Sequence, residues 1–300
     1  MPESPKFLQG ISYTTTHRAV PFVLESGFSC DFLCVGGGGG NNNNHPYYEG
    51  GGGAGGMRCS GQAYQGRGGA AESAVKVTCG VGYPVVIGQG GPGNVAGSPT
   101  YDGSPSSVFG FTALGGARGI YNNANGASGG SGGGAGGDNT TGFSGGSGTA
   151  LNGYDGGGSY NNGGMAGAKA GGGGGGAGGN GSDNGTNGNQ NKGGTGGLGL
   201  LWIDGLVYAC GGAGGYGAYN SQPVGDNAAN YPSGGRANAG NGGHWDSNDA
   251  SAGARGQGGD GVAVIRYKGG TKATGGTISS TGGFTYHTFT MSGTFTPLFK

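Results

Sequence analysis

Charged side chains are scarce in this sequence. The 300 residues include 14 Lys plus Arg and 14 Asp plus Glu, so 9% of the chain is charged and the formal net charge is zero, whereas ordinary soluble domains are roughly 25% charged. A nucleic-acid-binding protein needs a basic surface that neutralises phosphates, and a polybasic membrane binder needs clustered cations. The composition argues against both classes, and we expect no nucleic-acid partner.

Long apolar runs are missing as well. No stretch approaches the roughly 20 apolar residues that span a bilayer, so we expect no membrane insertion. The first residues, Met1–Pro5, lack the basic and apolar regions of a secretory signal peptide. From this we expect synthesis and first folding in a cytoplasm.

Cysteine and proline are sparse. Five cysteines in 300 residues are too few, and odd in number, for a disulfide scaffold. Cys30 and Cys34 have no His or Cys partner at zinc-ligand spacing, so small buried thiols are favoured over a metal site. With only 11 prolines, and with glycine not recurring strictly at every third position of the whole chain, collagen is excluded. The other cysteines are Cys59, Cys79 and Cys210.

Glycine, by contrast, accounts for 88 residues. A Gly/Asn/Ser-rich chain is usually a flexible coil, because glycine loses more conformational entropy on ordering than any other residue. Segments rich in β-branched and aromatic residues interrupt the glycine blocks. Such segments are typical of β-strands and not of flexible linkers. These predicted strands are residues 28–35, 74–79, 83–87, 108–114, 200–210 and 262–267.

The glycine blocks have a local period of three. Residues 192–201 and 213–219 repeat Gly-Gly-X, which matches the three residues per turn of a polyproline-II-type helix. Such a helix has no internal hydrogen bonds, so its N–H and C=O groups must bond to neighbours. We predict a mainly irregular and β fold with almost no α-helix. In it, left-handed polyglycine-II-type helices pack side by side around interior segments such as Gly171–Gly176, with embedded and flanking β-strands.

Several non-glycine segments stand in a recognisable order, ending in a Thr/Phe-rich stretch. From about residue 28 to residue 297 this order resembles the glycine-rich domain of bacteriophage tail-fibre adhesins and related virion proteins. The Cys residues, the Asn41–Asn44 run and the Asn/Tyr/Asp-rich insertions depart from that pattern. The segments that carry the resemblance are residues 32–40, 83–91, 106–116, 202–212, 259–267 and 273–296.

The resemblance implies a virion surface structural protein, assembled in the cytoplasm of a bacterial host. Its partners would be other fibre, tail or capsid proteins, with an oligomer as one arrangement. Residues 1–27 would form an N-terminal β segment that attaches to the virion or caps the next part. Residues 28–267 would form the polyglycine-helix domain, and residues 268–300 a C-terminal β segment.

The C-terminal β segment carries five large apolar or aromatic residues. We expect them to pack one face against the end of the bundle or to pair with a neighbouring subunit. They are Ile278, Phe284, Tyr286, Phe289 and Phe295.

Several inserted stretches combine Tyr, Asn, Ser, Gly and Asp. Antibody paratopes use this mixture, because Tyr and Trp supply contact area at low entropic cost while Asn and Ser hydrogen-bond adaptably. We interpret the stretches as loops that contact a host surface glycan or outer-membrane protein; the alternative is that they are ordinary turns. The candidate contact residues are Tyr47, Tyr48, Tyr121, Tyr160, Tyr219, Tyr231, His244 and Trp245.

Motifs for chemistry are weak. GxGxxG recurs by chance in so glycine-rich a chain and lacks a flanking βαβ unit. The four histidines are scattered, and no GxSxG nucleophile accompanies the His244–Asp246 pair. We expect no enzyme, no cofactor and no metal site. The favoured function is host recognition at a tail fibre or tail tip; the alternative is a capsid decoration or head-fibre protein, and ice binding is less favoured.

Overall fold

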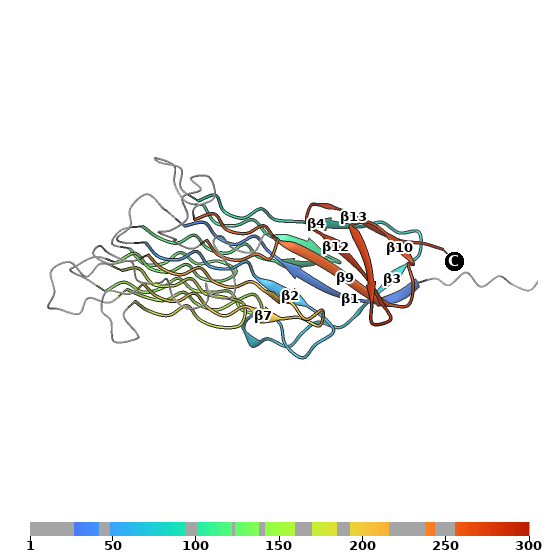
Figure 1. Ribbon diagram of the computed structural model, residues 1–300, viewed down its shortest axis with the longest axis horizontal. Coiled ribbons are helices and arrows are strands. Elements are labelled where there is room, and N and C mark those ends of the chain that lie inside the picture. The colour runs from blue at the N-terminus through green and yellow to red at the C-terminus, as the bar shows by residue number, and fades with distance from the viewer. Residues whose placement is uncertain are drawn as a thin grey trace, which may run out of the picture.

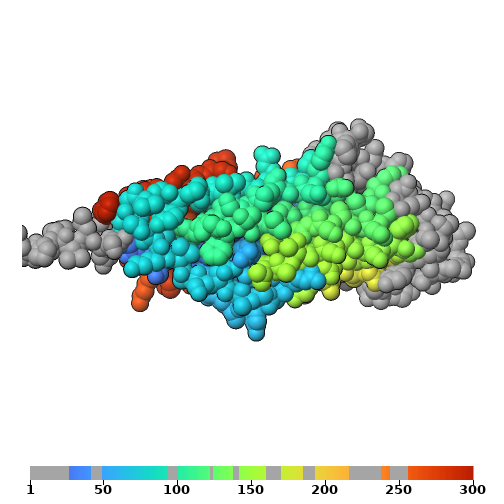
Figure 2. Space-filling view, turned by 180° about the vertical axis from the view of Figure 1, so that it is seen from behind, coloured from blue at the N-terminus to red at the C-terminus, as the bar shows by residue number. Residues whose placement is uncertain are grey.

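The computed structural model describes residues 27–41, 49–93, 101–121, 124–137, 142–159, 170–184, 193–215, 238–243 and 256–299. The body is elongated (Figure 1). β-Sheets occupy one end, and glycine-rich segments run away from them side by side. Figure 2 shows from the opposite side that the green and yellow-green segments form one continuous surface beyond the sheets. The described residues contain no α-helix, only the short 3₁₀ turn η1 (Gly66–Gly68), so the mainly β prediction is confirmed.

The first sheet has six antiparallel strands, ordered β11-β12-β9-β1-β2, with β3 also paired to β1. Its centre is the pair β1–β9, in which Phe32 lies opposite Ile265. Apolar residues predominate in both strands, as expected for a sheet covered on two faces. The bounds are β1 (Gly27–Val35), β2 (Met57–Cys59), β3 (Val75–Thr78), β9 (Val262–Lys268), β11 (Thr277–Thr281) and β12 (Phe284–Phe289).

The second sheet has five antiparallel strands, ordered β10-β13-β4-β5-β6. A separate hairpin consists of β7 and β8. The bounds are β4 (Tyr83–Val86), β5 (Ser106–Val108), β6 (Phe111–Ala113), β7 (Leu200–Leu201), β8 (Val207–Tyr208), β10 (Ala273–Thr274) and β13 (Gly293–Pro297).

The two sheets enclose one hydrophobic cluster. Phe32 and Ile265 from the first sheet meet Phe295 from the second, and all three are fully buried. His287 is buried beside them: its Nε2 lies 2.9 Å from the Tyr267 hydroxyl and its Nδ1 2.7 Å from the Gly275 carbonyl oxygen. Both ring nitrogens therefore have partners, as a buried imidazole requires.

The opposite face of the first sheet forms a second cluster. Leu33, Val35 and Val264 pack there with Trp202 and Tyr208 of the β7–β8 hairpin. The indole Nε1 of Trp202 donates to the Ser60 carbonyl oxygen at 3.0 Å. This contact attaches the hairpin to the sheet.

Two predicted strands are hairpins instead. The predicted strand 108–114 is interrupted at Phe109 and Gly110, whose φ angles of 52° and 82° make a two-residue turn between β5 and β6. The predicted strand 200–210 turns around Gly205 and separates into β7 and β8. Strands 28–35, 74–79, 83–87 and 262–267 are confirmed within one or two residues at each end.

The prediction that the C-terminal aromatic residues share one face is wrong. Side chains alternate along a strand, so Tyr286 joins the second cluster while Phe289 points into the first. Phe295 is also in the first cluster, whereas Ile278 is 43% exposed. The predicted buried thiols are confirmed for four cysteines, and Cys210 is half-buried.

Backbone hydrogen bonds between glycine segments follow a period of three. In Gly36–Asn41, the first and fourth amides donate to one neighbouring segment, the second and fifth to another, and the third and sixth to a third. The distances are between 2.6 and 3.0 Å. The pairs are Gly36 with Gly56, Gly39 with Gly53, Gly37 with Ser104, Gly40 with Tyr101, Gly38 with Gly259 and Asn41 with Gly256.

The segment Gly171–Ala177 repeats this rotation and is fully enclosed. A Cβ added at any of its glycines would lie against a backbone carbonyl oxygen of a neighbouring segment, closer than van der Waals contact allows. Side chains are therefore excluded here by neighbouring main chains. The pairs are Gly171 with Gly215, Gly174 with Gly212, Ala177 with Ala209, Gly172 with Ala135, Gly175 with Gly132, Gly173 with Ser182 and Gly176 with Gly179.

Candidate functional site

The glycine segments end together, away from the sheets (Figure 1). The Asn41 amide donates to the Gly256 carbonyl at 2.6 Å, and the Gly215 amide donates to the Glu49 carbonyl at 2.7 Å. Glu49 also forms a β-bridge with Tyr121. We call the residues Asn41, Glu49, Tyr121, Gly215 and Gly256 the distal ends; Asn41 bonds to Gly256, and Glu49 pairs with both Gly215 and Tyr121.

The distal ends border the predicted contact loops. Asn41 and Glu49 bound the first loop, Tyr121 opens the second, and Gly215 and Gly256 stand near two others. Of the candidate contact residues, the structure describes Tyr121 alone, and it is half-buried beside Glu49. The remaining candidates lie outside the described residues: Tyr47, Tyr48, Tyr160, Tyr219, Tyr231, His244 and Trp245. The predicted N-terminal β segment, residues 1–27, also lies outside them except for Gly27.

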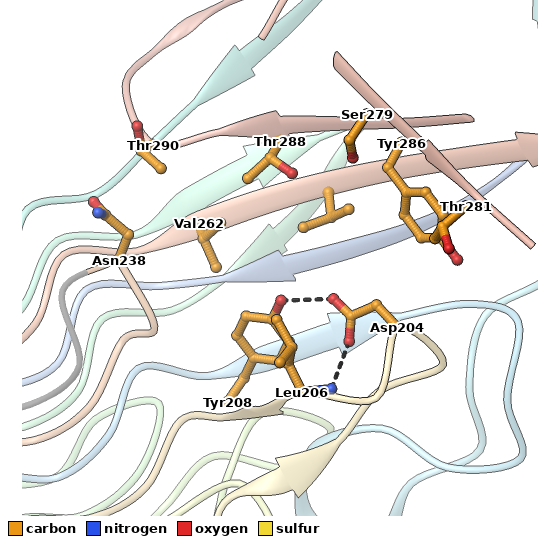
Figure 3. A pocket seen from close by; sticks show the side chains of 11 residues that line it. Asp204, Leu206, Tyr208, Asn238, Val262, Ser279, Thr281, Tyr286, Thr288 and Thr290 are labelled. Atoms are coloured by element: carbon orange, nitrogen blue, oxygen red, sulfur yellow. Dashed lines mark hydrogen bonds between the residues drawn. The ribbon is translucent and has the colours of Figure 1, made fainter. Parts of the chain in front are cut away.

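A second feature was not predicted: a groove between the β7–β8 hairpin and the strands β9, β12 and β11 (Figure 3). It has a volume of about 360 Å³, within the roughly 300–1,000 Å³ of small-molecule sites. Tyr286 and Thr281 stand on one side, and Asp204 and Tyr208 on the other. The buried side chains of Val262 and Val264 also line it.

The hairpin turn fixes the Asp204 carboxylate. Its Oδ1 accepts from the Leu206 amide at 2.9 Å, and its Oδ2 accepts from the Tyr208 hydroxyl at 2.7 Å. Both bonds are drawn in Figure 3. Because Tyr208 is itself buried against the sheet, the carboxylate is held at the rim in one orientation.

An ion pair supports the opposite wall. Arg266 donates to the Asp31 carboxylate at 2.8 Å and lies over the Phe284 ring. Burial lowers the pKa of Arg266, but hydrogen bonds to Asp31 and Tyr286 outweigh this and raise its pKa overall. Arg266 therefore stays charged and contacts Tyr286, its cross-strand neighbour, while its charge is balanced by Asp31.

The buried thiols are poor candidates for chemistry. Burial raises the pKa of Cys30, Cys34 and Cys59 to about 12, and the thiolate is the reactive form. Within the described ranges, no three His, Cys, Asp or Glu residues gather as metal ligands. The same part of the chain holds no helix with the length and apolar character to cross a membrane.

Sequence reasoning could not find the groove, because its walls come from four separate parts of the chain. Two local signals were present: the Asp-Gly turn at 204–205 and the Thr/Ser-rich strands after residue 276. Neither predicts that the hairpin faces those strands, since that contact depends on Trp202.

Comparison with known proteins places the chain in a family. The family model for the glycine-rich domain matches residues 15–268, which is most of the sequence. No curated protein and no solved structure matches the chain. The protein belongs to the glycine-rich domain family.

Proposed function

We propose that this protein is a bacteriophage virion surface protein that recognises the host cell at a tail fibre or tail tip. Its loops beyond the distal ends would contact a surface glycan or an outer-membrane protein. The proposal is one of binding without catalysis. It rests on the order of segments in the sequence, on the loop composition and on the geometry of the glycine body.

The proposed scaffold is a bundle of polyglycine-II-type helices. The supporting observation is the pattern of backbone hydrogen bonds in Gly36–Asn41 and Gly171–Ala177. In both segments, every third amide donates to the same neighbouring segment. Three residues per turn with no internal hydrogen bonds is the geometry of that helix. Lateral bonding on three sides makes each segment rigid along its length.

The observation that carries the proposal is where the start of β1 and the residues after β13 lie. Gly27 pairs with Thr78, the Gly80 amide donates to Pro297 at 2.8 Å, and Phe299 lies against Gly80. The start of β1 and residues 297–299 therefore lie together at the sheet end, opposite the distal ends (Figure 1). In this proposal one end would serve attachment, and the other would carry the contact stretches that follow the distal ends.

Fixed loop bases favour binding. Association loses free energy wherever side chains and loops must be ordered, and a rigid support reduces that loss. The stretches 42–48, 216–237 and 244–255 are rich in Tyr, Asn and Ser, the composition of paratopes that combine rigid aromatic contacts with adaptable hydrogen bonds. Their spacing around one end would create a composite contact surface.

Adsorption of phage particles to their host tests this proposal. Replacing Tyr47, Tyr48 and Trp245 together with Ala should abolish adsorption and leave the melting temperature nearly unchanged. A matched control is Tyr64→Ala: Tyr64 is 62% exposed and lies on the side of the body near β2. It should leave both adsorption and melting temperature unchanged.

Two results would contradict the proposal. Adsorption that persists in the triple variant would show that these three residues are not needed for host recognition. Binding of the isolated protein to empty heads instead of host cells would identify a capsid decoration protein. A labelled antibody in electron micrographs of intact particles gives an independent location.

A further inference from the structure

The groove defined above is lined mainly by groups that form hydrogen bonds without carrying charge. Ser279, Thr281, Thr288 and Thr290 present hydroxyls from β11, β12 and the residue after β12, and Asn238 presents an amide. Hydroxyls both donate and accept, and an amide does so through separate atoms. Such a lining matches a ligand that itself carries many hydroxyl groups.

Asp204 adds one directional acceptor at the rim. Each carboxylate oxygen has two lone pairs, and the bonds from Leu206 and Tyr208 use one on each oxygen. An acceptor position therefore stays open on both oxygens, at a fixed spacing. Two adjacent hydroxyls of one ligand can donate to this pair without any rearrangement of the protein.

Apolar surface complements these polar groups. The Tyr286 ring is half-buried on the wall facing Asp204, with Val262 and Val264 also lining the groove. Leu206, 40% exposed, lies at the hairpin rim. A ligand with one apolar face and a polar edge would cover the ring and still reach Asp204 and the hydroxyls.

The charge of the lining restricts the ligand further. Asp204 is the charged residue among those that line the groove, and Arg266, the cross-strand neighbour of Tyr286, is paired with Asp31. A phosphate, sulfate or acidic ligand would be repelled by Asp204 and would find no free cation. A single carboxylate also makes a poor site for a divalent metal, which takes several oxygen ligands.

We infer that this groove binds a neutral saccharide. A pyranose ring presents C–H groups on one face and hydroxyls around its edge, which matches the tyrosine wall, the valines and the surrounding polar groups. This site is distinct from the loops beyond the distal ends, and the inference goes beyond the host-recognition function proposed above. It gives the molecule a second binding surface, along the side of the sheet end.

Saturation-transfer NMR on the full chain tests the inference. The probes are methyl α-D-glucoside, methyl β-D-galactoside and N-acetyl-D-glucosamine, with glucose 6-phosphate as the charged comparison. At least one neutral probe should receive saturation, strongest at the ring C–H protons that face Tyr286. Glucose 6-phosphate should receive less saturation than methyl α-D-glucoside, because Asp204 repels the phosphate.

Two variants assign the signal to the groove. Tyr286→Leu removes the ring but keeps apolar packing, and it should weaken binding about tenfold. Thr288→Trp exchanges one lining hydroxyl for a bulky ring that fills the groove, and it should abolish binding. The matched control Tyr64→Leu, at an exposed tyrosine away from the groove, should bind like the parent protein.

The outcomes separate the inference from the proposed function. Loss of saccharide binding in both groove variants, with folded protein by thermal denaturation, supports the site. If one of the two groove variants does not fold, saccharide binding by the other variant tests the site. Absence of binding by all neutral probes at millimolar concentration, or binding that survives Thr288→Trp, overturns it. The Tyr47, Tyr48 and Trp245 triple variant should bind the probes normally, whatever its effect on adsorption.

Discussion

At the residue scale, the missing Cβ of glycine is what lets main chains touch. Gly174 shows the arrangement: its amide donates to Gly212 at 2.8 Å, and the position of an added Cβ is occupied by the Gly52 carbonyl oxygen. Ordering a glycine is entropically expensive, and a net hydrogen bond offsets only about 0.5–1.5 kcal/mol. The arrangement is stable because many such bonds form together.

We predict that Gly174→Ala destabilises the protein by about 3 kcal/mol, because the new methyl group must displace a backbone that is itself hydrogen-bonded to its neighbours. Urea denaturation measures this change. Gly270→Ala is the control, since an added Cβ there meets nothing within 4 Å, and its stability should equal or slightly exceed the parent's. A Gly174→Ala protein as stable as the parent would contradict the close packing.

At the element scale, the β7–β8 hairpin depends on side chains that pack against the first sheet, of which Trp202 is the largest. Each of its strands has two residues, and isolated two-stranded hairpins are marginal in water. Trp202, 2% exposed, supplies the missing stability by packing against Met57 and Val264 in the second cluster. The hairpin is therefore positioned by tertiary contact.

Trp202→Ala should lower the free energy of unfolding by roughly 3–5 kcal/mol. Trp202→Phe, which keeps an apolar ring and loses the bond to the Ser60 carbonyl, should be clearly milder. Denaturant midpoints of the two variants, compared with the parent, give the difference. Equal effects would assign the role to the hydrogen bond instead of the packing.

Sequence patterns predicted strands where apolar residues are continuous and failed where a turn lies inside them. β1 and β9 are buried on both faces, so their composition alone identified them. The β5–β6 turn was missed because Phe109 adopts a positive φ, which is rare for an aromatic residue. β2 has three residues, Met57–Cys59, too few for any periodicity.

At the scale of the whole molecule, two kinds of interior share one body. Hydrophobic clusters hold the sheet end, whereas main-chain hydrogen bonds hold the glycine segments. The period of three was visible in the sequence, but the choice of neighbours was not, because a glycine carries no side chain that specifies its partner. For the same reason the meeting of the distal ends could not be predicted.

Amide hydrogen exchange tests this picture across the chain. Amides in Gly36–Gly40 and Gly171–Gly176 should exchange as slowly as those of β9, because both sets open only with large-scale unfolding. The exposed turn at Gly282 and Gly283 should exchange fast and serves as the internal reference. Fast exchange throughout the glycine segments would show a mobile polymer and remove the rigid support for the loops.

The rotating pattern of donors also governs which changes in length the body can accept. Inserting a triplet into a glycine segment adds one donor toward each neighbour and leaves every later amide facing its former partner. Inserting one or two residues rotates every later amide, so that each one points at a different neighbouring segment from the one it bonds to now. A glycine segment can therefore lengthen or shorten only in steps of three residues.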